Sequence, residues 1–131
     1  MSNLIFHMIN GAPDPVAPFS HAVEVDGFVF LTGQMPFEGI SNTSNYPVTI
    51  EDQTHQVMRN LITVLQGTGL NLSNVFSVRI FLTHFNEDYE KMNAVYAGYF
   101  PANKMPARTC VGVTGLARDA RIEIDMIAKK N

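Results

Sequence analysis

Two stretches near the C-terminus carry side chains that could do chemistry. Residues 106–114 read PARTCVGVT and residues 121–128 read RIEIDMIA, and both alternate as β-strands do. The first stretch holds Arg108 and Cys110, and the second holds Glu123. An arginine can bind a carboxylate through two parallel hydrogen bonds, and a glutamate can accept and return a proton. This set of residues is therefore typical of a site for a small acid.

The alternation also predicts which way these side chains point. We expect the more apolar sets, which include Val111 and Ile124, to face the helices, since two helices can cover only one side of a sheet. Arg108, Cys110 and Glu123 would then lie together on the uncovered side. An uncovered face with few charges predicts a second copy of the protein as its cover, with Arg108 at a subunit interface.

Each of these residues also has an ordinary structural interpretation. An arginine and a glutamate on neighbouring strands form a plain cross-strand ion pair more often than a site. A single cysteine in a strand, such as Cys110, is most often a small buried hydrophobe. Asn93 shares a predicted helix face with Tyr89 and Tyr96, and an asparagine there is more often a hydrogen-bonded helix residue than a ligand contact.

Other chemistries find no support in the sequence. The four histidines show no spacing suited to a metal, and one cysteine cannot complete a zinc site, so we expect no metal. The motifs G-x-x-x-x-G-K-[ST], G-x-G-x-x-G and G-x-S-x-G are absent, so nucleotide binding and serine hydrolysis are not indicated.

The composition predicts one globular domain over residues 1–131, with a mass of 14.5 kDa. Only 16% of the residues are charged, which fits a surface partly buried against another subunit. The net charge of −3 and the scattered basic residues argue against a nucleic-acid partner. No segment approaches the roughly 20 apolar residues of a membrane span, and residues 1–10 do not resemble a signal peptide. A cytoplasmic setting is the simplest expectation.

The rest of the chain supplies the elements that position these residues. Apolar patterning and turn signals predict the order β-ββ-α-β-α-ββ. The remaining strands are expected at 4–9, at 75–83 and as the two strands of a hairpin within 21–33. The helices are expected at 49–69 and 86–100. This order predicts an α+β fold, an α/β layer in which a mixed six-stranded sheet carries both helices on one face.

Local signals define several boundaries. Asp26-Gly27 predicts a type I′ hairpin turn, because both positions of that turn need a positive φ. Thr49 and Asn86 are the expected N-caps of the two helices. Residues 38–47 predict a polar loop.

Three segments resemble the RidA (YjgF) family of enamine/imine deaminases. Residues 106–128, PARTCVGVTGLARDARIEIDMIA, closely resemble its C-terminal signature, APFSHAVEVDGFVFLTGQMP resembles its N-terminal hairpin, and MNAVYAGYF resembles its second helix. The resemblance covers essentially the whole chain. It implies a chorismate-mutase-like fold assembled as a homotrimer with sites in clefts between subunits. It also implies a hydrolase acting on C=N bonds, which converts 2-aminoacrylate and similar 2-imino acids to 2-keto acids and ammonia without a cofactor.

The resemblance assigns roles to the residues that match the family pattern. Arg108 matches the arginine that binds the substrate carboxylate, and Glu123 matches the acidic residue that positions or activates water. Cys110 matches a cysteine lining the pocket. Thr32 and Gly33, of the Thr-Gly-Gln at 32–34, match pocket residues.

Asn93 matches a helix asparagine near the family's site. Phe19 stands where well-studied members have tyrosine, so its ring can wall the pocket but cannot donate a hydrogen bond. Gly112 replaces a larger residue, which predicts a wider cleft. Both departures concern the range of substrates.

Two other functions remain open from the sequence. The family has also been described as a ribonuclease or translation inhibitor, but the acidic balance and the lack of a basic stripe argue against RNA. A ligand-sensing or chaperone-like module using the same clefts is the other alternative, because an arginine that binds carboxylates does not by itself imply hydrolysis.

Overall fold

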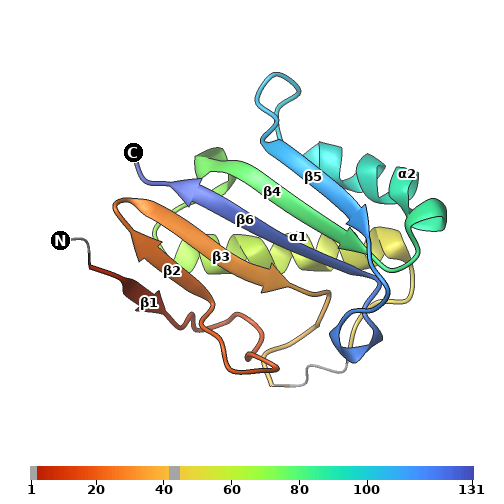
Figure 1. The fold of residues 1–131 in the computed structure, drawn as a ribbon, viewed down its shortest axis with the longest axis horizontal. Helices are drawn as coiled ribbons and strands as arrows, with labels where there is room; N and C mark the ends of the chain where they lie inside the picture. The colour runs from red at the N-terminus through yellow and green to blue at the C-terminus, as the bar shows by residue number, and fades with distance from the viewer. Residues whose placement is uncertain (1–2, 42–44) are drawn as a thin grey trace.

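The computed structural model describes residues 3–41 and 45–131, so residues 42–44 of the predicted loop 38–47 lie outside the described residues. Within the described residues, six strands form one sheet in the spatial order β1-β2-β3-β6-β4-β5, and two helices pack on one of its faces (Figure 1). The strands are β1 Ile5–His7, β2 Ala22–Val25, β3 Phe28–Gln34, β4 Val75–Leu82, β5 Ala107–Gly112 and β6 Ile122–Lys129, and the helices are α1 Ile50–Gly67 and α2 Phe85–Tyr96. Strands β4 and β5 are parallel and the other pairs are antiparallel. The predicted element order and mixed six-stranded sheet are confirmed.

A tight turn joins β2 to β3, as the sequence predicts. Asp26 has a φ of 52° and Gly27 a φ of 80°, so both central residues are left-handed, as a type I′ turn requires. The turn fixes the register of β3, and β3 carries Thr32 and Gly33 near its end.

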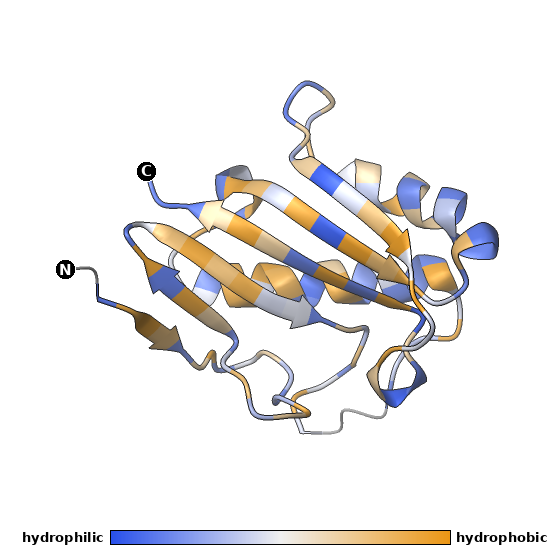
Figure 2. Cartoon of the chain, viewed as in Figure 1, coloured by the Kyte–Doolittle hydropathy of each residue, from blue (hydrophilic) through white to orange (hydrophobic). Residues whose placement is uncertain are grey.

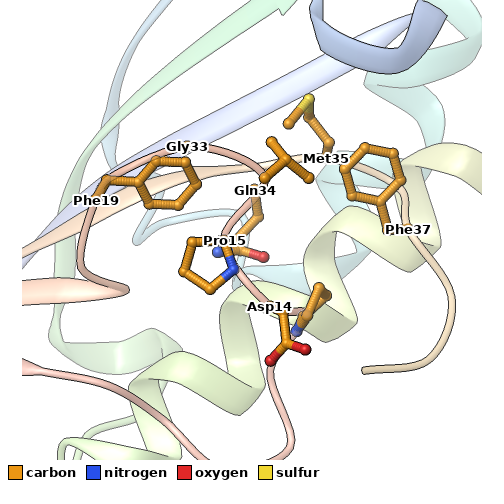
Figure 3. A pocket seen from close by; sticks show the side chains of 9 residues that line it. Asp14, Pro15, Phe19, Gly33, Gln34, Met35 and Phe37 are labelled. Carbon is orange, nitrogen blue, oxygen red and sulfur yellow. The ribbon is translucent and has the colours of Figure 1, made fainter. Parts of the chain in front are cut away.

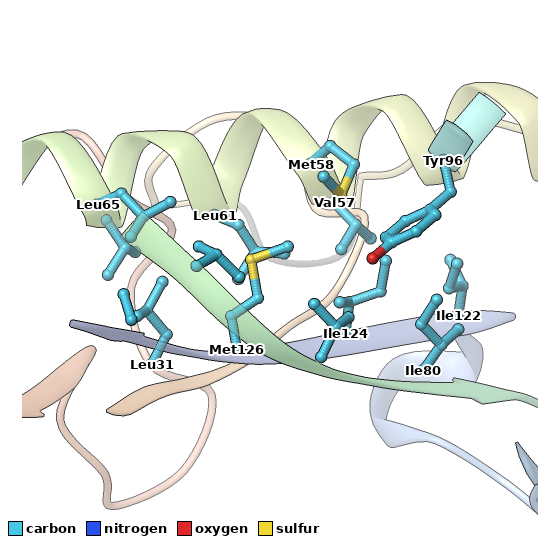
Figure 4. Close-up of a cluster of buried hydrophobic side chains, with 14 of the residues drawn as sticks. Leu31, Val57, Met58, Leu61, Leu65, Ile80, Tyr96, Ile122, Ile124 and Met126 are labelled. Carbon is cyan, nitrogen blue, oxygen red and sulfur yellow. The ribbon is translucent and has the colours of Figure 1, made fainter. Parts of the chain in front are cut away.

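The hydrophobic core lies between α1 and the sheet (Figure 4). The Thr49 hydroxyl caps α1 by accepting a hydrogen bond from the backbone N–H of Asp52 at 3.1 Å, which confirms the predicted cap. Side chains one helical turn apart on α1 are fully buried, namely Val57, Leu61, Val64 and Leu65. They pack over buried strand residues, which include Leu31, Ile80, Ile124 and Met126. This packing fixes which face of β4 and β6 points toward the helices.

The predicted N-cap of α2, Asn86, lies two residues after the observed one. The helix begins at Phe85, and its N-cap is His84, whose side chain makes no capping hydrogen bond. Asn86 lies inside the first turn instead. A tertiary contact accounts for the shift: Arg121 donates hydrogen bonds of 2.9 Å from Nε and Nη2 to the buried carboxylate of Asp88, which holds this turn against the start of β6.

The predicted orientation of β5 is also wrong. Val78 and Ile80 of β4 are buried under the helices, and their neighbours in register on β5 are Arg108 and Cys110. Neighbours in register point to the same face, so Arg108 and Cys110 face the helices. Val111 points the other way and is 41% exposed. The prediction failed because β5 is an edge strand, and the side of it that faces α2 meets tyrosine and asparagine rather than an aliphatic layer.

The face of the sheet opposite the helices, called the open face here, is uncovered in a single chain and carries exposed apolar side chains. Figure 2 colours the strands of this sheet by the hydropathy of each residue. Phe28 and Phe30 of β3 point to it and are 37% and 45% exposed. Glu123 lies on this face too, because its neighbours Ile122 and Ile124 are buried on the helix side. No helix in the described part of the chain is long and apolar enough to cross a membrane.

Candidate functional site

Arg108 is held by one face of α2. Its Nη1 donates a 2.8 Å hydrogen bond to Oδ1 of Asn93, and its Nη2 lies 3.4 Å from the hydroxyl of Tyr89. The guanidinium carbon lies 5.2 Å from the ring centre of Tyr96 and 5.9 Å from that of Tyr89. These residues lie at helical spacing on α2, so one helix face fixes the guanidinium in place. The structure thus brings Asn93 into direct contact with Arg108.

A pocket of about 330 Å³ opens beside this guanidinium. It is lined by Asn93, Tyr96, Ala97, Met105, Pro106 and Arg108, so its walls are mainly apolar. Among the described residues, no carboxylate forms an ion pair with Arg108. A cation without a counter-ion at an apolar pocket is suited to bind the carboxylate of a small ligand.

The ion-pair interpretation of Arg108 therefore fails, and a different pair occupies the sheet. Arg79 on the open face binds Asp125 through both carboxylate oxygens, with Nη2 2.6 Å from Oδ2. This pair joins β4 to β6. In the part of the chain that the structure describes, Arg108 on the other face has no acidic partner.

Glu123 lies on the open face beside Gly33. A Cβ on Gly33 would overlap Oε2 of Glu123 and would lie 2.8 Å from its Cδ, so the carboxylate occupies the space that glycine leaves free. Burial raises the pKa of Glu123, and the negative charge of Asp125 raises this pKa further, against a lowering by Arg79. A carboxyl whose pKa is raised in this way holds a proton more readily than an ordinary glutamate, which suits a group that accepts and returns a proton.

Phe19 and Gly33 line the same small hollow, shown in Figure 3. The hollow has a volume of about 10 Å³, and the proline-rich loop before β2 contributes Pro13 and Pro15 to its wall. Thr32 precedes Gly33 on β3 and lines a broader depression of the open face together with Arg79. Phe19, Thr32, Gly33 and Glu123 therefore form one group.

Cys110 faces the helices, as Arg108 does, but its surroundings do not favour a reactive thiol. It is half-buried and packs against the core. Burial raises the pKa of its thiol, although the nearby charge of Arg108 works in the opposite direction. The thiol form is favoured, which agrees with a lining or packing role rather than with a nucleophile. At Gly112, an added Cβ would lie 3.2 Å from the Cβ of Phe85, so Phe85 lies close beside this glycine within the chain. The wider cleft at Gly112 stays a prediction.

The predicted site residues thus fall into two groups on opposite faces of the sheet. Asn93, Cys110 and Arg108 lie on the helix side, and Glu123 with Gly33 lies on the open face. The prediction that Arg108 and Glu123 share the uncovered face is wrong. Within the described residues, no group of three or more acidic, histidine or cysteine side chains could hold a metal ion.

Comparison with known proteins gives the family. Residues 9–130 match the family model described as Endoribonuclease L-PSP. A RutC family protein of Pyrococcus horikoshii, PH0854, is 39% identical over 130 residues that cover 99% of both chains. A 2-iminobutanoate/2-iminopropanoate deaminase of Dermatophagoides farinae is 38% identical over 118 residues, which cover 88% of both chains.

The chain belongs to the RidA (YjgF) family. The fold agrees with this assignment, since the crystal structure of E. coli TdcF with bound serine superposes with a TM-score of 0.84 at 28% identity, covering 95% of this chain and 99% of that one.

Sequence reasoning missed part of what surrounds Arg108 in this RidA-family chain. Tyr89 and Tyr96 hold the guanidinium, and Met105 and Pro106 form the pocket wall. The helical spacing of Tyr89, Asn93 and Tyr96 was visible in the sequence and could have identified the two tyrosines. Nothing in the sequence points to Met105, because its role depends on how the loop before β5 folds.

Proposed function

We propose that this protein hydrolyses reactive enamines and imines, namely 2-aminoacrylate and similar 2-imino acids, to 2-keto acids and ammonia. The observation that carries this proposal is the guanidinium of Arg108, which is held rigidly at an apolar pocket with no carboxylate partner among the described residues. The deaminase name of one relative and the serine bound by another support it. We place this activity in the cytoplasm, in keeping with a chain that has a single cysteine.

The site that performs this reaction is completed between subunits of a homotrimer. In one chain, Arg108 and Glu123 are separated by the sheet, so one substrate cannot contact both. Strand β5 is at the edge of the sheet, where the Arg108 pocket can meet a neighbouring subunit. The exposed aromatic residues of the open face give that neighbour an apolar surface to bury. Arg108, Asn93 and Cys110 then come from one subunit, and Phe19, Thr32, Gly33 and Glu123 from the next.

The reaction needs little beyond orientation and a path for protons. The enamine tautomerises to the imine, whose C=N carbon lies next to the carboxylate that Arg108 binds. Water adds to this carbon and gives a carbinolamine, and the C–N bond then breaks to release ammonia and the keto acid. Glu123 accepts a proton from the attacking water and delivers it to the leaving nitrogen. Each of these steps uses water and side chains of the protein, and we propose no cofactor.

The pocket beside Arg108 also favours certain substrates. Met105, Pro106 and Ala97 offer apolar contacts and no charge. We therefore expect unbranched or branched aliphatic side chains to be accepted, and charged side chains to be disfavoured by desolvation.

A mixed-subunit experiment tests the proposed site. Arg108→Ala and Glu123→Ala chains are each expected to form inactive trimers. When the two are co-expressed, a trimer that contains both kinds has one cleft with an intact Arg108 and an intact Glu123. Imine hydrolysis should therefore return on mixing, to roughly one-third of wild-type turnover per mixed trimer. No recovery in verified mixed trimers, or a monomer by light scattering at micromolar concentration, would contradict the intersubunit site.

A further inference from the structure

His21 is a buried histidine whose four polar groups all have backbone partners. It is 2% exposed. Its backbone N–H donates to the carbonyl of His7, and its carbonyl accepts from the N–H of Thr32, both at 3.0 Å. One residue thus links the end of β1 to the segment of β3 that carries the predicted site residues Thr32 and Gly33.

The imidazole makes two further bonds across the loop before β2. Its Nδ1 accepts a 2.8 Å hydrogen bond from the backbone N–H of Ile9, and its Nε2 lies 2.7 Å from the carbonyl of Pro13. Because Nδ1 must accept from an amide, the ring is neutral with its proton on Nε2, which donates to Pro13. The ring therefore connects the two ends of residues 9–13.

This loop has few other means of holding its shape. Prolines at positions 13, 15 and 18 have no N–H, so the backbone can form few bonds with itself. The loop's other described backbone bonds here are a long one of 3.4 Å from Ala12 to Ile9 and one of 2.9 Å from Asp14 to Ile40. The residue Pro13 is buried, and without His21 its carbonyl would lose the donor that the structure gives it.

We propose that His21 is a positioning residue for the half of the site that lies on the open face. The loop it ties carries Phe19, and Figure 3 shows the Phe19 ring beside Gly33 at the hollow they share. Gly33 in turn borders the carboxylate of Glu123. His21 contacts neither group directly and acts by fixing the loop and β3 relative to each other. This inference rests on the proposed function for the role of Glu123, but the structural tie itself does not.

The chemistry of the tie predicts which substitution can replace histidine. Glutamine has an oxygen that can accept from Ile9 and an amide that can donate to Pro13, so His21→Gln should keep both bonds. Leucine has a comparable apolar volume but neither group, so His21→Leu should lose both. Asparagine has the same groups on a shorter side chain and should be intermediate.

The test compares these three variants in deaminase kinetics, in binding of 2-oxobutyrate and in melting. His21→Leu should lower kcat about tenfold or more, since small misplacements of catalytic groups are costly. Its 2-oxobutyrate affinity should stay within about twofold of wild type, because Arg108 lies on the other half of the site. His21→Gln should restore kcat. A role in stability alone would lower the melting temperature of His21→Leu with kcat per folded trimer unchanged, and that result would overturn the proposal.

Hydrogen exchange separates this proposal from the proposed function. The amide of Ile9 should exchange faster in His21→Leu than in wild type, and His21→Gln should slow it again. If the wild type hydrolyses no imine, the proposed function fails, whereas rescue of the Ile9 amide by glutamine still supports the tie. Equal protection in the wild type and His21→Leu would overturn it. Should His21→Leu fail to fold, His21→Asn provides the same comparison.

Discussion

Arg108 and Glu123 lie on opposite faces of the same sheet, one under α2 and the other on the open face. This relationship means that neither residue can complete the proposed site within one chain. Arg108 and Glu123 can be tested separately, because each belongs to a different half of the proposed site and contacts different neighbours.

The first prediction concerns Arg108→Lys. Lysine keeps the charge but cannot make the bond to Asn93 and also bind a carboxylate through two parallel bonds. Loss of one charge-assisted hydrogen bond is worth about 1.5–3 kcal/mol, or roughly tenfold to a hundredfold in kcat/KM. The exposed Arg59→Lys on α1 is the matched control and should change nothing. Equal 2-oxobutyrate affinity in wild type and Arg108→Lys, measured by calorimetry, would remove Arg108 as the carboxylate ligand.

The second prediction concerns Glu123→Gln. Turnover should fall more than 2-oxobutyrate binding, because the proposed partner of Glu123 is water. In the wild type, kcat/KM should fall as the pH drops through the pKa of Glu123, which burial and Asp125 hold above its ordinary value. If the residual activity of Glu123→Gln shows the same fall of kcat/KM at low pH, the titrating group is a residue other than Glu123.

The raised pKa of Glu123 makes stability depend on pH in the opposite direction to activity. A raised pKa in the folded state means that the folded protein keeps the proton over a pH range in which the unfolded chain has released it. Stability therefore falls as the pH rises through this window. Glu123→Gln should melt at a higher temperature than wild type at pH 7, and the difference should vanish below the ordinary carboxyl range. A variant that melts lower at pH 7 would show that the carboxylate has a stabilising partner in the trimer.

The third prediction concerns Cys110→Ala. Most deaminase activity should remain, because burial favours the neutral thiol and water is the proposed nucleophile. A complete loss together with a covalent adduct on Cys110, seen by mass spectrometry, would overturn this.

The fourth prediction concerns the hydroxyl of Tyr96, which points into the core (Figure 4). Among the described residues, this hydroxyl is the buried side-chain polar group that lacks a hydrogen-bond partner. Burial raises the pKa of Tyr96. Tyr96→Phe removes this group and keeps the ring beside Arg108, so it should stabilise the protein by about 1 kcal/mol in chemical denaturation. Tyr99→Phe is the contrasting control, since its hydroxyl bonds Nδ1 of His55 at 2.6 Å and its loss should destabilise.

The fifth prediction concerns RNA. With a net charge of −3 and scattered basic residues, the protein should neither bind nor cleave single-stranded RNA at physiological salt. Cleavage that co-elutes with the oligomer and disappears in Arg108→Ala would instead favour the nuclease activity that the family description names.

The local parts of the fold could be predicted because short-range chemistry decides them. Asp26-Gly27 gave the hairpin and Thr49 the start of α1, since both signals act within a few residues. The direction of Arg108 could not be predicted in this way. Its stretch alternates regularly, but which set points inward depends on the tyrosines of α2, which lie in another element. Asn86 failed as a cap for a similar reason, because the bond between Arg121 and Asp88 spans 33 residues.

Folding and turnover place different demands on position 33. The nearest atoms to an added methyl group would be Oε2, Cδ and Cγ of the Glu123 side chain rather than backbone, so this side chain could turn aside, and the backbone there does not have a positive φ. The fold would therefore accept alanine at this position with little loss. The carboxylate, however, would be displaced from its place. Selection on folding alone would leave position 33 free to vary, whereas selection on turnover would keep it glycine, so a population of random variants sorted first for solubility and then for growth should separate the two pressures at this single residue.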